Sequence, residues 1–390
     1  MPSFRHRTKT GINVNVNVKD EFAGADFSRS GKPKIGFVMK NQEIEYPLST
    51  RPGDGEVLEV AEGVLWVRMP IPIPGLDYIN LYLLEDDDGW TMVDSGLNTP
   101  KIRELWESIF AAHLKGKPVT RLICTHFHPD HMGQAGWITK RWDIPLTMTF
   151  GEWTFGRMLY LEAQEETPEF VIDFYASVGF DAEMMERVKS RGHNHFRQIM
   201  STVPMGFERI SDGDILTIGR RNWQVMVGKG HSPEHACLYS KADGILISGD
   251  QVLPRITPHI GIYPAEPLAN PLKKFIESID MLVKLPRDTL ILPAHNDVFT
   301  GLHNQLDYYK THHEDRLNRL LGACDSPQSA LDLLPVLFDR ELDEGDRSMG
   351  VAEGLAHCHY LIGEGRLERL KDTDGIWKFR RRGAAHLAVA

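Results

Sequence analysis

Four side chains that commonly bind metals stand close together in the segment 126–131, which has the pattern H-x-H-x-D-H. In an extended chain alternate side chains project to one side, so His126 and His128 can share one ion at roughly 2.0–2.1 Å. The proline after His128 redirects the chain, which allows Asp130 and His131 to face a neighbouring position. The pattern therefore predicts one metal site and the start of a second.

Three further candidate ligands each follow a strand-like run. His231 lies in a Gly-His-Ser-Pro segment, Asp250 follows Ser-Gly, and His295 follows Pro-Ala. Small residues leave room for an ion and its substrate, and loops at strand ends are where scaffolds usually carry their sites. Taken singly, each histidine would be interpreted as a hydrogen-bonded core residue. Together with the segment 126–131, the three residues are enough to complete two metal sites.

Two divalent cations a few ångströms apart can hold a bridging hydroxide near neutral pH, because coordination lowers the pKa of water from about 15.7 towards about 7. That hydroxide is the expected nucleophile, so no serine or cysteine nucleophile is required. Asp130 could also steer the nucleophile or its proton. Zinc suits a mixture of histidine and carboxylate ligands, and manganese or iron would accept the same set.

The elements that must position these residues are short strands and amphipathic helices. Thr99 and Pro100 can start one helix, and 271–285 is a second. The segment 151–205 is helical and rich in aromatic residues, which favours helix packing, as a lid or pocket wall, over a dedicated acyl groove. Strand-like runs bounded by Gly, Pro or Asp occupy 57–60, 64–69, 79–84, 90–93, 119–124, 214–218, 223–227, 236–239 and 244–248.

Five motifs, in this order, resemble the metallo-β-lactamase superfamily over residues 55–300. They are the segments 93–96, 125–131, 230–232, 248–250 and 293–295. The resemblance implies an α/β fold, an αββα metallo-β-lactamase sandwich, that carries two metals. An aspartate at position 250 fits the hydrolase branches better than the branch of secreted lactamases, which has a cysteine ligand there. Antibiotic resistance is therefore not the expected role.

The resemblance also implies a role for each candidate residue. The ligands of the first metal would be His126, His128 and His231. The ligands of the second would be Asp130, His131 and His295. Asp250 would bridge the two ions, and Asp94 would support the site from behind the ligands.

The chain after residue 310 has helices with Leu and Ala spacing, followed by a hairpin-like pair of runs. This arrangement resembles the winged-helix appendage of a beta-lactamase-like group that includes a mitochondrial endoribonuclease. The expected organisation is an N-terminal extension (1–45), a hydrolase domain (46–310) with the helical insertion 151–205, and a winged-helix-like module (311–390). Subunit contact or pocket closure is the favoured role of that module.

Composition restricts the partners of the protein. The chain has 390 residues, with 44 basic and 54 acidic side chains and a net charge of −10, which disfavours a nucleic-acid partner. No run is apolar enough for a membrane helix, and the N-terminus has no secretory signal anatomy, so we expect a cytoplasmic protein. The N-terminal extension is expected either to be partly disordered or to contact another subunit of a homo-oligomer.

The expected activity is hydrolysis of a small ester, thioester or lactone. Arg255, His259 and Tyr263 follow the bridging aspartate and are candidate substrate contacts, although ordinary polar loop residues would look the same. His312 and His313 are expected to face solvent. The alternative function is that of a metal-dependent single-strand endoribonuclease, whose C-terminal module would bind nucleic acid.

Overall fold

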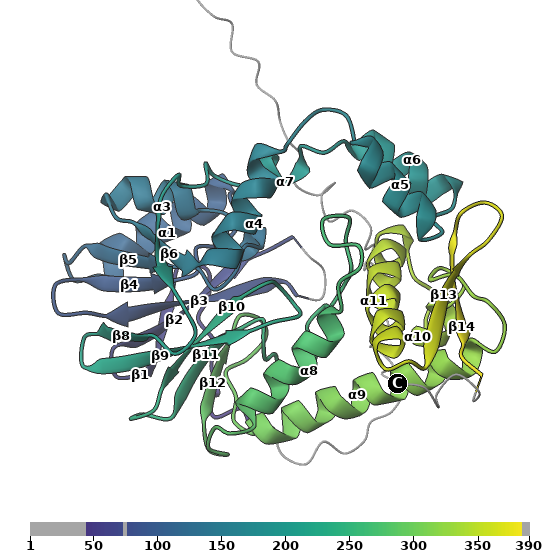
Figure 1. Ribbon diagram of the computed structural model, residues 1–390. Coiled ribbons are helices and arrows are strands. Elements are labelled where there is room, and N and C mark those ends of the chain that lie inside the picture. Colours follow the sequence, from purple (N-terminus) through teal and green to yellow (C-terminus); the bar gives the residue numbers. More distant parts are fainter. Residues whose placement is uncertain (1–43, 73–75, 384–390) are drawn as a thin grey trace, which may run out of the picture.

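The computed structural model describes residues 44–72 and 76–383 (Figure 1). All but the last two residues of the predicted N-terminal extension lie outside this part. A seven-stranded sheet has the order β1-β2-β3-β4-β5-β6-β7. Its strands are β1 (Val57–Ala61), β2 (Val64–Pro70), β3 (Tyr78–Glu85), β4 (Trp90–Val93), β5 (Val119–Ile123), β6 (Leu146–Thr149) and β7 (Phe207–Ile210).

A second sheet packs against the first and has the order β12-β11-β10-β9-β8. Its strands are β8 (Ile215–Ile218), β9 (Arg221–Gly228), β10 (His235–Ser240), β11 (Ile245–Gly249) and β12 (Leu290–Pro293). Trp66 and Tyr82 of the first sheet share a buried core with Trp223, Val225 and Leu238 of the second. The two sheets therefore form the middle layers of a sandwich.

Helices cover the outer faces of both sheets. On the first sheet, α1 (Pro100–His113) buries Trp106 and Ile109 in the same core cluster as the outward side chains of β2 to β6, and α3 (Ala135–Trp142) contributes Ile138. On the second sheet, α8 (Pro271–Leu282) and α9 (Leu302–Ala323) bury apolar side chains in one core cluster with side chains of that sheet. The expected αββα sandwich is confirmed, and Figure 1 shows the layers edge-on.

The two predicted helices begin where the sequence places them. Thr99 accepts a hydrogen bond from the Ile102 amide through its hydroxyl at 3.2 Å, and Pro100 occupies the first turn of α1. Asn270 caps α8 in the same way, with 3.2 Å to the Lys273 amide. Each cap satisfies one of the amides that a helix N-terminus leaves unpaired.

The strand directions bring the candidate ligands to one edge of the sandwich. The strands β4, β5 and β6 are parallel, and β11 is parallel to β12. Because β9 and β11 both run antiparallel to β10, they share a direction. The loops that follow β4, β5, β9, β11 and β12 carry all the candidate ligands and Asp94. Two strands, β6 and β7, were not predicted, because each has only four residues and β7 carries exposed charges.

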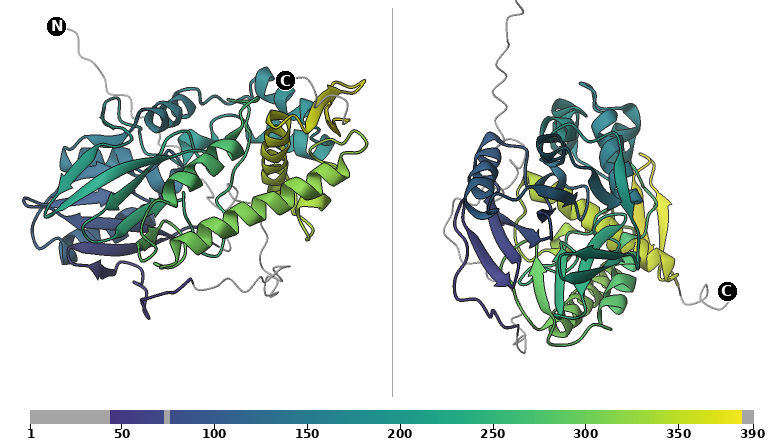
Figure 2. Two further views of the ribbon diagram at one scale, coloured as in Figure 1. Left: turned by 60° about the horizontal axis from the view of Figure 1, so that its bottom comes forward. Right: turned by 90° about the vertical axis from the view of Figure 1, so that its left-hand side faces the viewer.

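The helical insertion and the C-terminal module pack against each other. The insertion contains α4 (Phe150–Leu161), α5 (Glu169–Ser177), α6 (Ala182–Arg191) and α7 (His195–Gln198). The ring of Phe174 in α5 meets that of Trp377 edge-on at 6.2 Å, and Asp181 pairs with Arg347. Figure 2 shows the module beside the sandwich with the insertion arching over to reach it. These contacts hold the insertion against the C-terminal module, and their role as a lid or pocket wall stays a prediction.

The C-terminal module consists of helices followed by a two-stranded hairpin. Its elements are α10 (Leu334–Leu337), α11 (Glu344–Gly363), β13 (Leu367–Lys371) and β14 (Trp377–Arg381), which follow the end of α9. The helix α9 runs through the predicted boundary at residue 310, so the domain limits stay a prediction, as does the winged-helix comparison. The expectation that His313 faces solvent is wrong: α9 turns this side chain toward His357 of α11, at 3.1 Å, and leaves it 1% exposed.

Candidate metal centre

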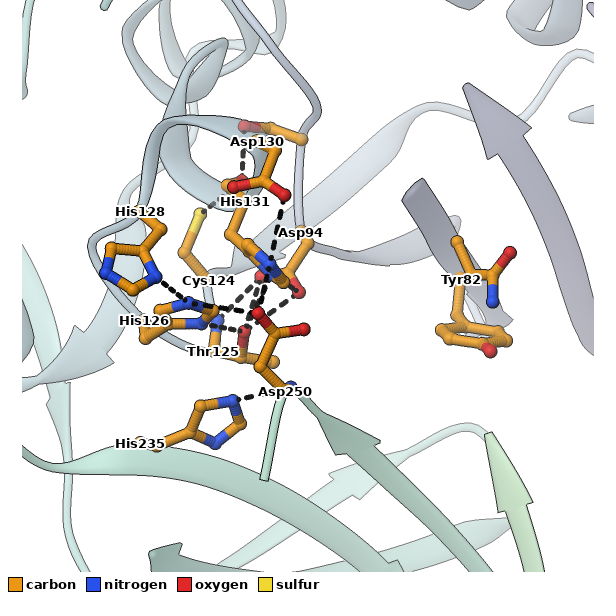
Figure 3. Close-up of polar contacts among 12 residues, drawn as sticks. Tyr82, Asp94, Cys124, Thr125, His126, His128, Asp130, His131, His235 and Asp250 are labelled. Carbon is orange, nitrogen blue, oxygen red and sulfur yellow. Dashed lines mark hydrogen bonds and ion pairs between the residues drawn. The ribbon is translucent and has the colours of Figure 1, made fainter. Parts of the chain in front are cut away.

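Three imidazoles from two loops converge on one point. The Nε2 atom of His126 lies 2.8 Å from Nδ1 of His128 and 3.2 Å from Nε2 of His231, and the last two atoms are 3.1 Å apart. A carboxylate oxygen of Asp250 completes this first group, whose ligand atoms all lie within 4.8 Å of one another. Figure 3 shows His126, His128 and Asp250 turned toward the same space. Such a group has the size of a cation site.

A second group lies on the other side of Asp250. It contains Asp130, His131 and His295, and its ligand atoms also lie within 4.8 Å of one another. The Oδ2 atom of Asp130 is 3.4 Å from Nε2 of His295 and 3.7 Å from Nε2 of His131. The two groups contain all seven candidate residues, and the ligand roles that the resemblance implies stay a prediction.

Asp250 faces both groups. Its Oδ2 atom lies 3.3 Å from Nε2 of His231 and 3.5 Å from Nε2 of His131, while its Oδ1 atom lies 3.5 Å from Nε2 of His295. The side chain therefore stands where a bridging ligand would stand. Figure 3 shows it between the loop that carries His131 and the ring of His235.

Hydrogen bonds behind the imidazoles fix which ring nitrogen faces the centre. The Nδ1 atoms of His231 and His295 lie 2.9 Å and 3.0 Å from the carbonyl oxygens of His259 and Tyr78. A carbonyl only accepts, so each Nδ1 must donate and each Nε2 keeps its lone pair for the centre. Partners of this kind orient metal-binding histidines.

Asp94 fixes which ring nitrogen of His131 faces the centre. Its Oδ2 atom accepts from Nδ1 of His131 at 2.8 Å, and its Oδ1 atom accepts from the Thr125 amide at 2.7 Å. Asp94 is buried and has a positive φ of 63°, which is uncommon for a residue with a side chain. The left-handed turn places the carboxylate under the loop 125–131, which agrees with the supporting position predicted for it.

The residues present fit divalent cations. Nε2 of His131 and Oδ1 of Asp250 are buried and, within the described part of the chain, have no hydrogen-bonding partner. Burial lowers the pKa of His126 and of His128, and neighbouring imidazoles lower each further, so both rings are neutral and can donate lone pairs. Unpaired buried groups of this kind are costly unless a ligand satisfies them.

The carboxylates of the centre are ionised. Burial raises the pKa of Asp130, but His131 and His295 outweigh it and bring the pKa to about 2. Burial likewise opposes ionisation of Asp250, whose pKa the same two imidazoles hold well below the ordinary value. Burial lowers the pKa of His131 and of His295, but the facing carboxylates outweigh it and raise both, so a cation would compete with a proton for each of these rings. Imidazoles and ionised carboxylates together form the donor set that zinc, manganese and iron accept.

Two buried residues that the sequence did not single out hold the ligand loops together. Glu152 of α4 accepts hydrogen bonds from the Phe127 amide at 3.0 Å, the Ser232 hydroxyl at 2.6 Å and the Glu234 amide at 2.6 Å. It thereby joins the loop of His126 and His128 to the loop of His231. The sequence feature that could have identified Glu152 is its position as the single acidic residue in the apolar, aromatic segment of α4.

His235 is the second such residue. Burial lowers its pKa to about 3, so the ring is neutral, and its Nε2 atom accepts a hydrogen bond from the Asp250 amide at 3.0 Å. The Cβ of any residue other than glycine at position 249 would lie 2.5 Å from this ring, and Gly249 has a φ of 50°. The loop before Asp250 thus requires glycine.

The three predicted substrate contacts occupy the loop after Asp250. Nε2 of His259 lies 2.7 Å from the Tyr263 hydroxyl, and the tyrosine is 44% exposed. Arg255 is also exposed, and its guanidinium contacts Tyr46 and Asp297. Their role toward a substrate stays a prediction.

The fold and the centre define a class of protein. The family model of the metallo-beta-lactamase superfamily matches residues 74–295, and that of the metallo-beta-lactamase-like C-terminal domain matches residues 317–382. The chain belongs to the metallo-beta-lactamase superfamily and is a hydrolase. Within the described residues, no helix is long and apolar enough to cross a membrane.

Individual relatives agree with this assignment. A beta-lactamase domain protein from Burkholderia ambifaria, known by crystal structure, is 38% identical and superposes with a TM-score of 0.80, covering 88% of this chain and 99% of its own. The probable metallo-hydrolase YqjP of Bacillus subtilis is 23% identical over 72% of this chain and 88% of its own. The acyl-coenzyme A thioesterase MBLAC2 of Bos taurus is 24% identical over 50% of this chain and 64% of its own.

Proposed function

We propose that the protein is a dinuclear metal-dependent hydrolase that cleaves small thioesters, with esters and lactones as chemically related substrates. The observation that carries the proposal is the convergence of seven side chains from four loops into two adjacent groups that share Asp250. No group of this composition is needed to stabilise a sandwich core. Its chemistry is that of a site for a hydrolytic metal pair.

Two bound cations would supply an activated water and a polarised carbonyl oxygen. The chain's own residues supply the geometry. His231, His295 and His131 are held in one tautomer by their Nδ1 partners. Oδ2 of Asp130, ionised at neutral pH and 14% exposed at its side chain, is the oxygen best placed to accept a proton from water entering the site.

One observation supports a thioester over other acyl compounds: a bovine relative is named an acyl-coenzyme A thioesterase. The zinc form is the one we propose, since the ligands are imidazoles and carboxylates.

The C-terminal module offers little free positive charge to RNA. Three basic residues near its end pair with an acidic side chain: Lys378 with Asp332 at 3.1 Å, Arg380 with Glu368 at 2.6 Å, and Arg381 with Asp325 at 3.6 Å. Paired cations release fewer counterions when they meet phosphates. We therefore place the endoribonuclease function second.

The test compares both activities in one preparation. Zinc-loaded protein is assayed on a panel of acyl thioesters and, in parallel, on labelled single-stranded RNA. His128→Ala should lower bound zinc and thioester hydrolysis by orders of magnitude, because it removes a ligand of the first group. His113→Ala, at the end of α1, is the matched control and should change neither. RNA cleavage that His128→Ala abolishes, without thioester hydrolysis, would reverse the ranking.

A further inference from the structure

A pocket lined by two arginines includes residues of the two loops that follow β11 and β12. It has a volume of about 400 Å³ and is lined by Tyr46, Leu48, Ser49, Arg51, Arg255 and Asp297. This volume is within the range of small-ligand sites, which is about 300–1,000 Å³. Arg255 is one of the three predicted substrate contacts, and the other lining residues have no role in the function proposed above.

The pocket lies at the same sheet edge as the candidate ligands. Asp297 is two residues beyond His295, after β12, and Arg255 is five residues beyond Asp250, after the parallel neighbour β11. Two residues span at most about 7 Å, so the pocket wall is close to His295. A substrate with its reacting bond at the centre could therefore place another group here.

The pocket carries more positive charge than its acid neutralises. Arg51 forms a two-armed pair with Asp297, in which one contact is 2.6 Å, and Arg255 contacts the same Oδ2 atom at 2.9 Å. A guanidinium has five N–H donors. Arg51 uses two nitrogens in these contacts, and Arg255 uses two, for Asp297 and for the Tyr46 hydroxyl at 3.1 Å. Among the described residues, neither Nη1 has a hydrogen-bonding partner, so each offers two donors.

A third arginine adds to the positive field. Burial lowers the pKa of Arg68 and nearby Arg51 lowers it further, whereas Asp297 and Asp54 act in the opposite direction. The Arg68 guanidinium carbon lies 4.0 Å from the centroid of the Tyr78 ring, and its Nε is buried without a partner among the described residues. Three guanidiniums thus face two carboxylates in a protein whose net charge is −10.

The backbone holds Arg255 in an uncommon conformation. Its φ is 70°, in the left-handed region that side chains with a Cβ seldom adopt. Strained residues of this kind cluster at binding sites. The side chain is half exposed, at 49%, although the Tyr46 ring stacks against it with 4.7 Å from its guanidinium carbon to the ring centroid. The guanidinium is therefore both fixed and accessible.

We propose that this pocket binds an anionic group, a phosphate or a carboxylate, on the leaving portion of the substrate. The inference rests on the proposed function, because it assigns the specificity of the same centre. Arginine recognises phosphate and carboxylate through paired N–H donors, and the free Nη1 groups of Arg51 and Arg255 supply them. Asp297 aligns the two guanidiniums.

The experiment compares substrates that share an acyl group and differ in the charge of the carrier. The carriers are coenzyme A, with phosphates, glutathione, with carboxylates, and N-acetylcysteamine, which is neutral. The readout is kcat/KM for an anionic carrier divided by kcat/KM for the neutral carrier. We expect Arg255→Gln to lower this ratio at least tenfold for one of the anionic carriers, mainly because KM for that carrier rises. Arg255→Lys should recover part of the loss. The two anionic arms distinguish phosphate from carboxylate.

The matched control is Arg220→Gln. Arg220 is 53% exposed and ion-paired like Arg51 and Arg255, but it lies just before β9, at the far end of that strand from His231. It should leave the ratio unchanged. Bound metal and thermal unfolding are measured for every variant. An equal loss of kcat/KM for charged and neutral carriers would show a structural clamp, and an unchanged kcat/KM for every carrier would show no anion site. Either result overturns the inference.

Binding is also measured without turnover, so that failure of the proposed function is recognised separately. Isothermal titration uses adenosine 3′,5′-bisphosphate and S-methylglutathione as probes. At least one should bind, with a dissociation constant raised at least tenfold in Arg255→Gln and with an affinity that falls as salt increases. Absence of thioester hydrolysis together with such binding would refute the proposed function alone. Absence of binding by both probes would refute the anion site.

Discussion

Replacing Glu152 with glutamine tests whether the two ligand loops depend on a buried carboxylate. Glu152 is completely buried, and burial raises its pKa to about 7 although the Ser232 hydroxyl and two amides lower it. At pH 8 most of the carboxyl groups are ionised and accept all three hydrogen bonds. Glutamine has the same shape and can accept at only one of its two terminal atoms.

The expected magnitude follows from the donors. One oxygen receives the Ser232 hydroxyl and the Glu234 amide, and the other receives the Phe127 amide. Whichever way the glutamine amide points, its NH₂ group meets at least one backbone N–H. A buried donor left unpaired costs about 1–3 kcal/mol, which is about 5–150-fold in an equilibrium constant. Changes behind metal ligands typically cost about 10–100-fold in metal affinity.

The assay is zinc competition against a chromophoric chelator at pH 8, with denaturant unfolding in parallel. Glu152→Gln should raise the zinc dissociation constant about 10–100-fold. Ser232→Ala, which leaves both amide contacts in place, should have a smaller effect. Glu107→Gln, at an exposed pair with Arg141, is the neutral control. Wild-type zinc affinity and stability in Glu152→Gln would refute the argument that this carboxylate holds the loops.

Three further changes have defined outcomes. Asp250→Asn should reduce the binding of both ions together, because the carboxylate faces both groups, and elemental analysis that finds two metals per chain would contradict this. Gly249→Ala should lower the free energy of unfolding by about 1–3 kcal/mol, from the close contact with His235 and the positive φ, and urea titration would measure it. Stability should also fall below about pH 6.5, because burial lowers the pKa of His313 and of His357, so the unfolded chain binds protons that the folded chain does not. Each imidazole adds up to about 1.4 kcal/mol per pH unit, and a His357→Gln variant with an equally steep decline would refute this.

The strand-end ligands could be predicted because their signal is local. The segment 126–131 carries its own spacing, and His231, Asp250 and His295 each stand after a recognisable apolar run. Period-two alternation and caps such as Thr99 also fix the sheets and helices that bring these loops to one edge. The resemblance to a known superfamily supplied the pairing of distant motifs, which local spacing alone does not determine.

The remaining residues of the site could not be predicted, because their roles arise from tertiary contacts. Glu152 is one polar residue in an aromatic helix, and its function depends on loops 25 and 80 positions away. His313 was predicted to face solvent, whereas α11 covers that side of α9. The signal for both lies in packing between elements far apart in the sequence.

The distribution of charge connects the proposed reaction with the proposed specificity. A chain with a net charge of −10 repels polyanions at long range, which disfavours RNA, yet repulsion between surface charges is screened beyond about 8–10 Å at physiological salt. Once a small substrate is at the sheet edge, the charged groups nearby determine how tightly it binds. There Arg51 and Arg255 share a single acid, Asp297, whereas Lys378, Arg380 and Arg381 of the C-terminal module each have an acidic partner of their own. The structure therefore favours a compact substrate whose anionic group is bound beside the metals over a long phosphate backbone held by the module.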